Sequence, residues 1–183
     1  LVYKMTDASY HHVLYSMALD VHNLLVRHQI AYWLDGGSLL GAVRHKGIIP
    51  YDDDIDIAIW EGDVLKLITA LPELTQYKVE FKPDMIKIFK ENTATEHLGN
   101  CTLDIFMYSR QCDIMTLEDN RWPEGWHRMK ELFPLKLVPF GDIQLYAPND
   151  PIDYLNRMYP KWQTEHINYK HHMKTGTFDN RLK

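Results

Sequence analysis

The sequence is poor in cysteine, with only Cys101 and Cys112 among its 183 residues. A small domain built on disulfides, or a zinc site made of four thiolates, needs more cysteines, so both classes are excluded. Two smaller arrangements stay open: one bond between the two cysteines, and a zinc site in which His97 and His127 join them. The cysteines therefore do not fix the redox compartment.

An excess of positive charge is also lacking, because the formal net charge is -5 at pH 7 and the sequence pI is about 6.0. A protein that attracts nucleic acid through its overall field is normally basic, so we expect no nucleic-acid partner. A phosphate-bearing ligand would have to be held by local cations or by metal ions.

Long apolar runs are missing as well. No run reaches the roughly 18 residues that span a bilayer, and no signal peptide is recognisable, so we expect no membrane segment in this chain. The chain begins at Leu1 rather than Met, which is typical of a processed form or of a piece of a longer protein. Hydrophobic residues make up 45% and charged residues 25% of the sequence, which favours one globular domain over residues 1–183.

The spacing of apolar residues predicts a mixed α/β (α+β) fold that begins with a helix. Helices are predicted over residues 6–29, 39–44, 64–71 and 151–158. Strands are predicted over residues 31–35, 54–59, 77–82, 85–90 and 102–108, with short strands on both sides of a turn at 140–142. Residues 109–125 are predicted to be irregular, and residues 169–183 to form a loose tail.

Two acids at alternate positions, Asp54 and Asp56, give the strongest chemical signal. Side chains at i and i+2 of a strand lie on one face, so these carboxylates would lie side by side while Ile55 and Ile57 enter the core. Neighbouring anions repel each other unless a hard divalent cation such as Mg²⁺ or Mn²⁺ lies between them. A third acid, Asp104, follows on a later predicted strand and would either complete the metal site or accept a proton.

The segment Gly36-Gly37-Ser38 predicts a phosphate-binding site. Two glycines after a strand let the backbone approach a ligand closely, and the N–H groups at the start of the next helix can bind phosphate oxygens. The Ser38 hydroxyl would add one more donor. Three basic residues follow, and they would either neutralise a diphosphate or fix the loop: Arg44, His45 and Lys46.

Each signal also has an ordinary structural interpretation. An acidic run such as residues 52–54 is usually an exposed loop, and paired glycines usually form a turn. An EF-hand that starts at Asp52 is excluded, because Ile57 and Asp63 stand where Gly and Glu are required. A Walker motif needs Gly-Lys-Ser/Thr, which the sequence does not contain. The combined order of signals favours a metal-dependent displacement at phosphorus.

The string from Leu34 to Ile57, LDGGSLLGAVRHKGIIPYDDDIDI, resembles the signature of the LicD and fukutin-related family. The combination of Gly-Gly-Ser, Asp-Ile-Asp and a later Leu-Asp-Ile resembles the nucleotidyltransferase fold shared with DNA polymerase β, a mixed sheet flanked by helices. Weaker similarity continues through residues 104–106, 133–135 and 154–162.

This resemblance implies transfer of a phospho-alcohol from a CDP-linked donor to a hydroxyl of a glycan acceptor. The alcohol would be choline, ribitol or glycerol. It implies that Asp54, Asp56 and Asp104 bind Mg²⁺ or Mn²⁺ and carry the catalysis. Residues 36–38 would contact the donor phosphates, with residues 44–46 nearby. A LicD-like microbial protein would be cytoplasmic, and a fukutin-like one would lie in the Golgi lumen.

The chain departs from the family pattern in several places. Its two cysteines cannot reproduce the zinc-binding cysteine cluster of the fukutin-related proteins, the region between Asp104 and Phe133 is compact, and Pro160 stands where the family more often has Gly. The transferred alcohol and the oligomeric state are not fixed by the sequence. Five aromatic residues would either cage a choline group by cation–π contact or pack in the core: Tyr51, Trp60, Trp122, Trp126 and Trp162.

Two other functions use the same residues. A nucleotidyltransferase would leave the nucleoside monophosphate on a small molecule or protein, and a non-catalytic binding module would keep the fold without the reaction. The presence of all three acids argues against the binding module, because loss of catalysis often removes a metal-binding acid.

Overall fold

The fold is built on a mixed sheet, seen in a computed structural model that describes residues 8–117, 122–164, 170–171 and 178–179. The strands of the main sheet follow the order β1-β2-β5-β4-β3, and only β2 and β5 are parallel. Beyond the end of β5, β6 pairs with β5 and β7 pairs with β6. The bounds of these strands are β1 Tyr32–Leu34, β2 Asp54–Trp60, β3 Lys78–Phe81, β4 Met85–Phe89, β5 Thr102–Gln111, β6 Ile114–Thr116 and β7 Trp126–Arg128.

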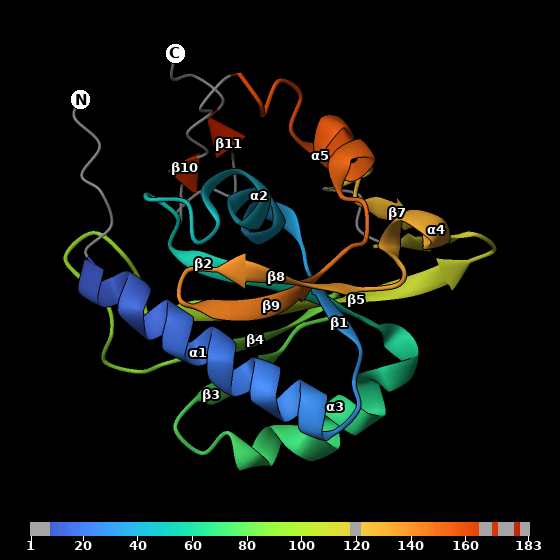
Figure 1. Ribbon diagram of the computed structural model, residues 1–183. Helices are drawn as coiled ribbons and strands as arrows, with labels where there is room; N and C mark the ends of the chain where they lie inside the picture. Colours follow the sequence, from blue (N-terminus) through green and yellow to red (C-terminus); the bar gives the residue numbers. More distant parts are fainter. Residues whose placement is uncertain (1–7, 118–121, 165–169, 172–177, 180–183) are drawn as a thin grey trace.

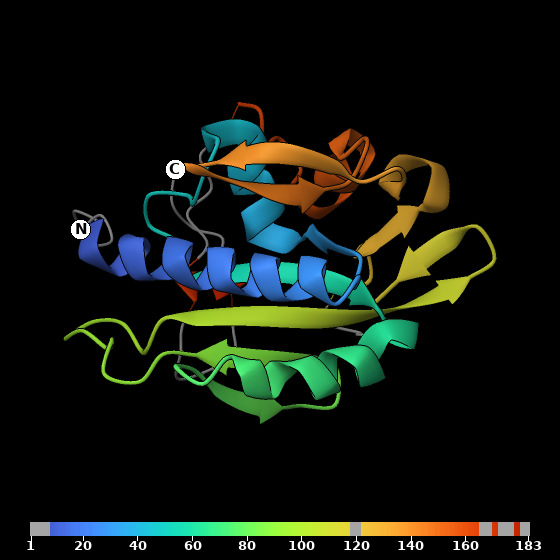
Figure 2. The same cartoon turned by 60° about the horizontal axis from the view of Figure 1, so that its bottom comes forward.

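Helices and two further hairpins surround this sheet (Figure 1). The helices are α1 Ala8–Arg27, α2 Gly36–His45, α3 Val64–Ala70, α4 Met129–Leu132 and α5 Ile152–Met158, with 3-10 turns η1 Glu61–Asp63 and η2 Leu71–Glu73. The hairpins are β8 Lys136–Phe140 with β9 Ile143–Ala147, and β10 Lys170–His171 with β11 Phe178–Asp179. Both views place α1 between the β8–β9 hairpin on one side and α3 with β3 on the other (Figures 1 and 2). Over the described residues, no helix has the length and apolar character needed to span a bilayer.

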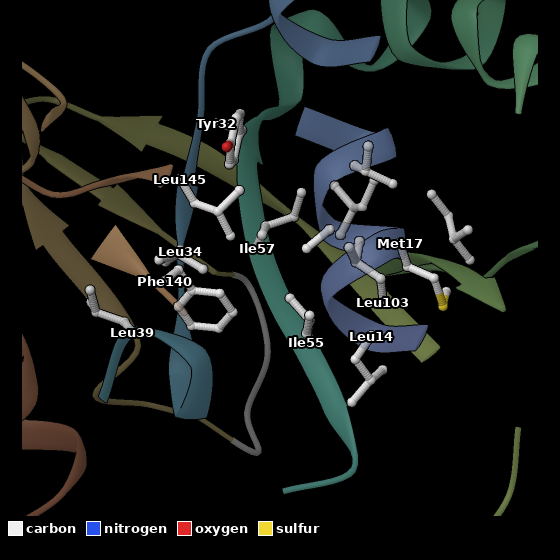
Figure 3. Close-up of a cluster of buried hydrophobic side chains, with 14 of the residues drawn as sticks. Leu14, Met17, Tyr32, Leu34, Leu39, Ile55, Ile57, Leu103, Phe140 and Leu145 are labelled. Atoms are coloured by element: carbon white, nitrogen blue, oxygen red, sulfur yellow. The ribbon is translucent and has the colours of Figure 1, made fainter. Parts of the chain in front are cut away.

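The main core lies between α1 and the sheet (Figure 3). Leu14 and Met17 of α1 are completely buried against the β2–β5 pair, where Ile55, Ile57 and Leu103 project toward the helix. Along β2, Ile55 and Ile57 point to this face, so Asp54 and Asp56 at the alternate positions point to the opposite face. The packing of α1 thus decides which face of the sheet carries the chemistry.

A second, smaller core lies on the other side of β1 and β5, where Trp33 and Tyr108 are buried with Met115 and Leu132. The rings of Trp33 and Tyr108 meet edge to face at 5.5 Å between centroids. This cluster packs β6 and α4 onto the far end of β5.

The predicted elements are confirmed in type, with two corrections. The second helix begins at Gly36 rather than at residue 39, so the Gly-Gly-Ser segment is its first turn and not a break before it. Residues 109–125 are not irregular throughout: β5 continues to Gln111, and β6 occupies Ile114–Thr116 after a turn in which Cys112 has a φ of 52°. The predicted tail lies mostly outside the described residues.

Candidate functional site

Three acids meet on the face of the sheet that is opposite to α1. Asp56 on β2 stands beside Asp104 on β5 in the parallel register, and Asp54 lies two positions before Asp56. One carboxylate oxygen from each of the three lies within 4.8 Å of the others. We call Asp54, Asp56 and Asp104 the acid cluster. The structure therefore brings together all three acids that the sequence singled out, while their roles stay predictions.

A second acidic group adjoins the acid cluster, because carboxylate oxygens of Asp52, Asp53 and Asp54 also lie within 4.8 Å of one another. The loop that carries it is tied to the start of α1. The Tyr10 hydroxyl donates to the Asp53 carbonyl at 3.2 Å, and the His11 Nε2 lies 2.8 Å from the Asp52 carbonyl. These two hydrogen bonds anchor the loop that carries Asp52 and Asp53 to the first turn of α1.

The first turn of α2 lies against the carboxylates. Gly36 has a φ of +49°, and a Cβ at that position would lie 3.0 Å from the Asp56 Oδ2. A Cβ on Gly37 would lie 3.2 Å from the Asp52 Oδ2. Ser38 is buried, and its Oγ accepts a hydrogen bond of 2.9 Å from the Asp56 N–H. The predicted phosphate-binding segment is thus the N-terminus of a helix, whose N–H groups and dipole favour anions, in direct contact with the acid cluster.

Burial and mutual repulsion raise the pKa values of two carboxyls at this site, those of Asp56 and Asp52. Burial, followed by the neighbouring Asp54, raises the pKa of Asp56 well above its ordinary range, and Asp104 adds to the shift. Burial, again followed by Asp54, raises the pKa of Asp52. A raised pKa records the cost of placing a further anion there. Oxygen ligands that repel one another in this way fit a divalent cation, which would remove the repulsion.

The start of α2 is held by a buried polar network that sequence reasoning missed. Asp35, the residue before the helix, is 4% exposed and accepts a 2.8 Å bond from the Tyr108 hydroxyl. The His127 Nε2 lies 3.4 Å from the other Asp35 oxygen, and the His127 ring stacks on Tyr154 at 4.1 Å between centroids. The Tyr154 hydroxyl accepts a bond from the Gly36 N–H at 3.2 Å.

Both tyrosines of this network have raised pKa values, which favours the protonated form of their hydroxyl groups. Burial, followed by the negative charge of Asp35, raises the pKa of Tyr108 and that of Tyr154. The Asp35 N–H also donates to the Asp56 carbonyl at 3.1 Å. The same residue therefore connects the buried network to the strand that carries the acid cluster.

The structure places the three predicted basic residues at the other end of α2. Arg44 lies eight positions after Gly36, which is roughly 12 Å along a helix. The Arg44 Nη1 donates to the Trp162 carbonyl at 3.3 Å, and its Nε to the His45 Nδ1 at 3.3 Å. Lys46 ends the helix with a left-handed φ of 60°. These contacts fix the loop, and phosphate binding by the three residues stays a prediction.

A cavity of about 380 Å³ opens beside the acid cluster, on the side of β3 and β4. Its lining includes Asp53, Asp54, Asp104 and Lys87, together with Tyr10 from α1. Lys87 is a further residue that the sequence reasoning missed. The available signal was a lysine between two isoleucines in the strand Met85–Phe89, which is an unusual place for a charge unless it has a partner.

The proposed cysteine arrangements are wrong. Both cysteines are free, Cys101 buried and Cys112 exposed. They flank opposite ends of the ten-residue strand β5, which separates them by roughly 30 Å. His127 lies in the Asp35 network instead, so these residues form neither a disulfide nor a common zinc site.

The five aromatic residues do not form a cage at the cavity, since none of them is part of its lining as the described residues define it. Trp162 is 8% exposed and packs in the core. The Trp126 ring lies under the Arg157 guanidinium, 3.5 Å from its centroid, with Arg128 at 5.2 Å. Its cation–π capacity is therefore already used within the chain.

The fold and the site define a member of the nucleotidyltransferase fold. The structure resembles that of the antibiotic-resistance factor ANT(2'')-Ia, with a TM-score of 0.50 over 84% of this chain and 78% of that chain, at 13% identity. The chain belongs to the LicD/FKTN/FKRP family, because the family model for its nucleotidyltransferase domain matches residues 29–150.

Several relatives carry names that describe transferases. The chain is 37% identical over 101 residues to the lipopolysaccharide cholinephosphotransferase LicD of Haemophilus influenzae. This match covers 48% of this chain and 38% of that protein. It is 60% identical over 137 residues to the ribitol 5-phosphate transferase FKRP of Homo sapiens, covering 66% and 26% respectively. A protein of Rickettsia typhi is 39% identical over 160 residues, or 87% of this chain and 49% of that protein. The chain spans about half the length of the first of the curated relatives it matches.

A divalent cation should stabilise the protein more at high pH than at low pH. Because Asp52 and Asp56 have raised pKa values in the folded state, folding without a cation binds protons, and this contribution to stability falls as the pH rises above the ordinary carboxyl value of about 3.9. A cation competes with those protons. At roughly 100 times its Kd, Mn²⁺ would add about 2.7 kcal/mol, or roughly 5–10 °C in Tm.

Thermal unfolding with and without Mn²⁺ at pH 5 and pH 8 measures this difference, and an Asp54→Asn variant serves as the control without a complete acid cluster. A shift in Tm that is larger at pH 5 than at pH 8, or that survives in the variant, would contradict cation binding at these carboxylates.

Proposed function

We propose that the protein transfers a phospho-alcohol from a CDP-linked donor to a hydroxyl of a glycan, in a reaction that depends on Mg²⁺ or Mn²⁺. The observation that carries the proposal is the acid cluster, with its carboxylate oxygens within 4.8 Å of one another at the first turn of α2, in a chain of the LicD/FKTN/FKRP family. The names of the relatives LicD and FKRP point to phosphocholine and to ribitol phosphate as the groups to test first.

Asp54 and Asp56 would hold the cation, with Asp104 next to them. The carboxylates of Asp54 and Asp56 fit such an ion by the chemistry of their oxygens and by their mutual repulsion, which adds to the effect of burial in raising the pKa of Asp56. When bound, the ion supplies positive charge at the phosphate oxygens of the donor.

Residues of the chain would position the donor and the acceptor for the reaction. The N-terminus of α2, with the backbone of Gly37 and Ser38, offers N–H groups to a donor phosphate. The glycan hydroxyl would enter from the cavity beside Asp104. Its oxygen forms a bond to the phosphorus that carries the alcohol, the bond from that phosphorus to CMP breaks, and the hydroxyl proton passes to water or to a carboxylate.

Calorimetric titration of CDP-choline, CDP-ribitol, CDP-glycerol and CTP in the presence of Mn²⁺ tests this function. We expect one CDP-alcohol to bind at least about tenfold tighter than CTP, a difference of about 1.4 kcal/mol. Binding should be lost without the metal and in the double variant Asp54→Ala, Asp56→Ala. Preference for CTP would favour a nucleotidyltransferase, and no metal-dependent binding of any nucleotide would favour a binding module.

A further inference from the structure

Lys87 stands in line with the acid cluster across the sheet. In the strand register Asp56 on β2 lies opposite Asp104 on β5, and Asp104 lies opposite Lys87 on β4. The row ends with Glu80 on β3, which lies opposite Lys87. Since directly opposed residues project from the same face, one positive charge is built into the row of acids.

The contact between Lys87 and Asp104 engages both oxygens of the carboxylate. The Lys87 Nζ lies 2.6 Å from the Asp104 Oδ1 and 2.8 Å from its Oδ2. The two side chains are only 21% and 9% exposed. A pair with so little solvent contact gains little net stability over apolar residues of the same size, so stability alone is a weak reason for it to occur at this position.

The position of Lys87 bears directly on how many cations the site can hold. A cation that used Asp54, Asp56 and Asp104 together would share the Asp104 carboxylate with the ammonium group or displace it. Two positive charges at such a distance in a partly buried site repel each other strongly. A cation held by Asp54 and Asp56 alone does not compete with Lys87 for the Asp104 carboxylate. The Lys87 ammonium group then supplies a second positive charge on the Asp104 side of the site.

We propose that Lys87 is a positioning residue that keeps Asp104 out of the cation's ligand set and stands in the place of a second metal ion. The proposal rests on the cation site of the proposed function and names the charge that works beside it. Lys87 also lines the cavity of about 380 Å³, so its ammonium group faces the space that we assign to the acceptor. In this arrangement the proton of the acceptor hydroxyl leaves to water, because the Asp104 carboxylate is already engaged.

Affinity for Mn²⁺ alone, measured by calorimetry and by the electron paramagnetic resonance signal of the ion, tests the proposal without any nucleotide. We expect the Lys87→Met variant to bind Mn²⁺ at least about tenfold tighter than the wild type, since one competing positive charge is removed. We expect the double variant Lys87→Met, Asp104→Asn to bind within about threefold of the wild type, because it removes a neutral pair and no ligand. Lys87→Arg should retain the wild-type affinity.

Three results would contradict the role proposed for Lys87. If the double variant loses as much Mn²⁺ affinity as Asp54→Asn does, or if Lys87→Met leaves the affinity unchanged, Asp104 is an ordinary ligand and the proposal is wrong. Absence of Mn²⁺ binding in the wild type overturns it too. Should Lys87→Met fail to fold, the double variant, in which no charge is left without its partner, still decides the question. Failure of the CDP-alcohols to bind would overturn the proposed function and leave this result standing.

Discussion

Asp54→Asn or Asp56→Asn is expected to lower the transfer rate by at least about 10³-fold, while leaving the fold intact. Loss of the cation removes several kcal/mol of charge stabilisation from the transition state, and about 4 kcal/mol corresponds to this factor. Asparagine keeps the size of the side chain and relieves the repulsion that raises the pKa of Asp56. Both variants should therefore be at least as stable as the wild type without metal.

Release of CMP from the CDP-alcohol that binds is the measurement for this prediction. Asp142→Asn is the matched control, because it removes one carboxylate charge at the exposed turn between β8 and β9, and its rate should equal that of the wild type. A rate above a tenth of the wild-type value in either acid variant would show that the acid cluster does not carry the catalysis.

Asp35→Ala is expected to destabilise the protein by about 3 kcal/mol, because it leaves buried groups without their partner. The Tyr108 hydroxyl, at 2.8 Å, and the His127 ring, at 3.4 Å, both lose the carboxylate. For a chain of this length the loss corresponds to roughly 10 °C in Tm. Thermal and urea unfolding measure it. Asp35→Asn keeps an acceptor oxygen and should lose less.

Another aspartate that directly precedes a helix, Asp63, supplies the control for Asp35. Asp63 precedes α3, is 9% exposed and pairs with Lys66 at 2.6 Å, but the Lys66 side chain is 58% exposed. Since exposed ion pairs contribute little, Asp63→Ala should cost under about 1 kcal/mol. Equal losses in Asp35→Ala and Asp63→Ala would mean that the buried network adds nothing to the start of α2.

The acid cluster was predictable because its signal is local. Asp54 and Asp56 follow the period of two that a half-buried strand imposes, and Ile55 with Ile57 identifies the buried face. Asp104 has the same kind of apolar neighbours. The parallel pairing that sets Asp104 beside Asp56 depends on which strands become neighbours, and the family resemblance supplied that part.

The start of α2 and the Lys87 contact were missed for different reasons. A Gly-Gly pair is usually read as a turn, and here a positive φ at Gly36 begins the helix directly after the buried Asp35. Lys87 is 17 residues from Asp104 in sequence, so its role follows only from the β4–β5 register. His127 is 92 residues from Asp35, and no pattern in the sequence connects them.

The two glycines at the start of α2 differ in how strongly the structure requires them, and this difference would affect which substitutions appear in proteins that evolve from this one. Gly36 is required twice, by its φ of +49° and by the 3.0 Å that would separate its Cβ from Asp56. Gly37 is required only by the carboxylate of Asp52, at 3.2 Å from its Cβ. In a lineage that abandons the reaction and replaces its acids, Gly36 would still be retained by the backbone. Gly37 would no longer be required. We therefore expect a substitution at Gly37 to be the first sign that a related protein has lost the reaction.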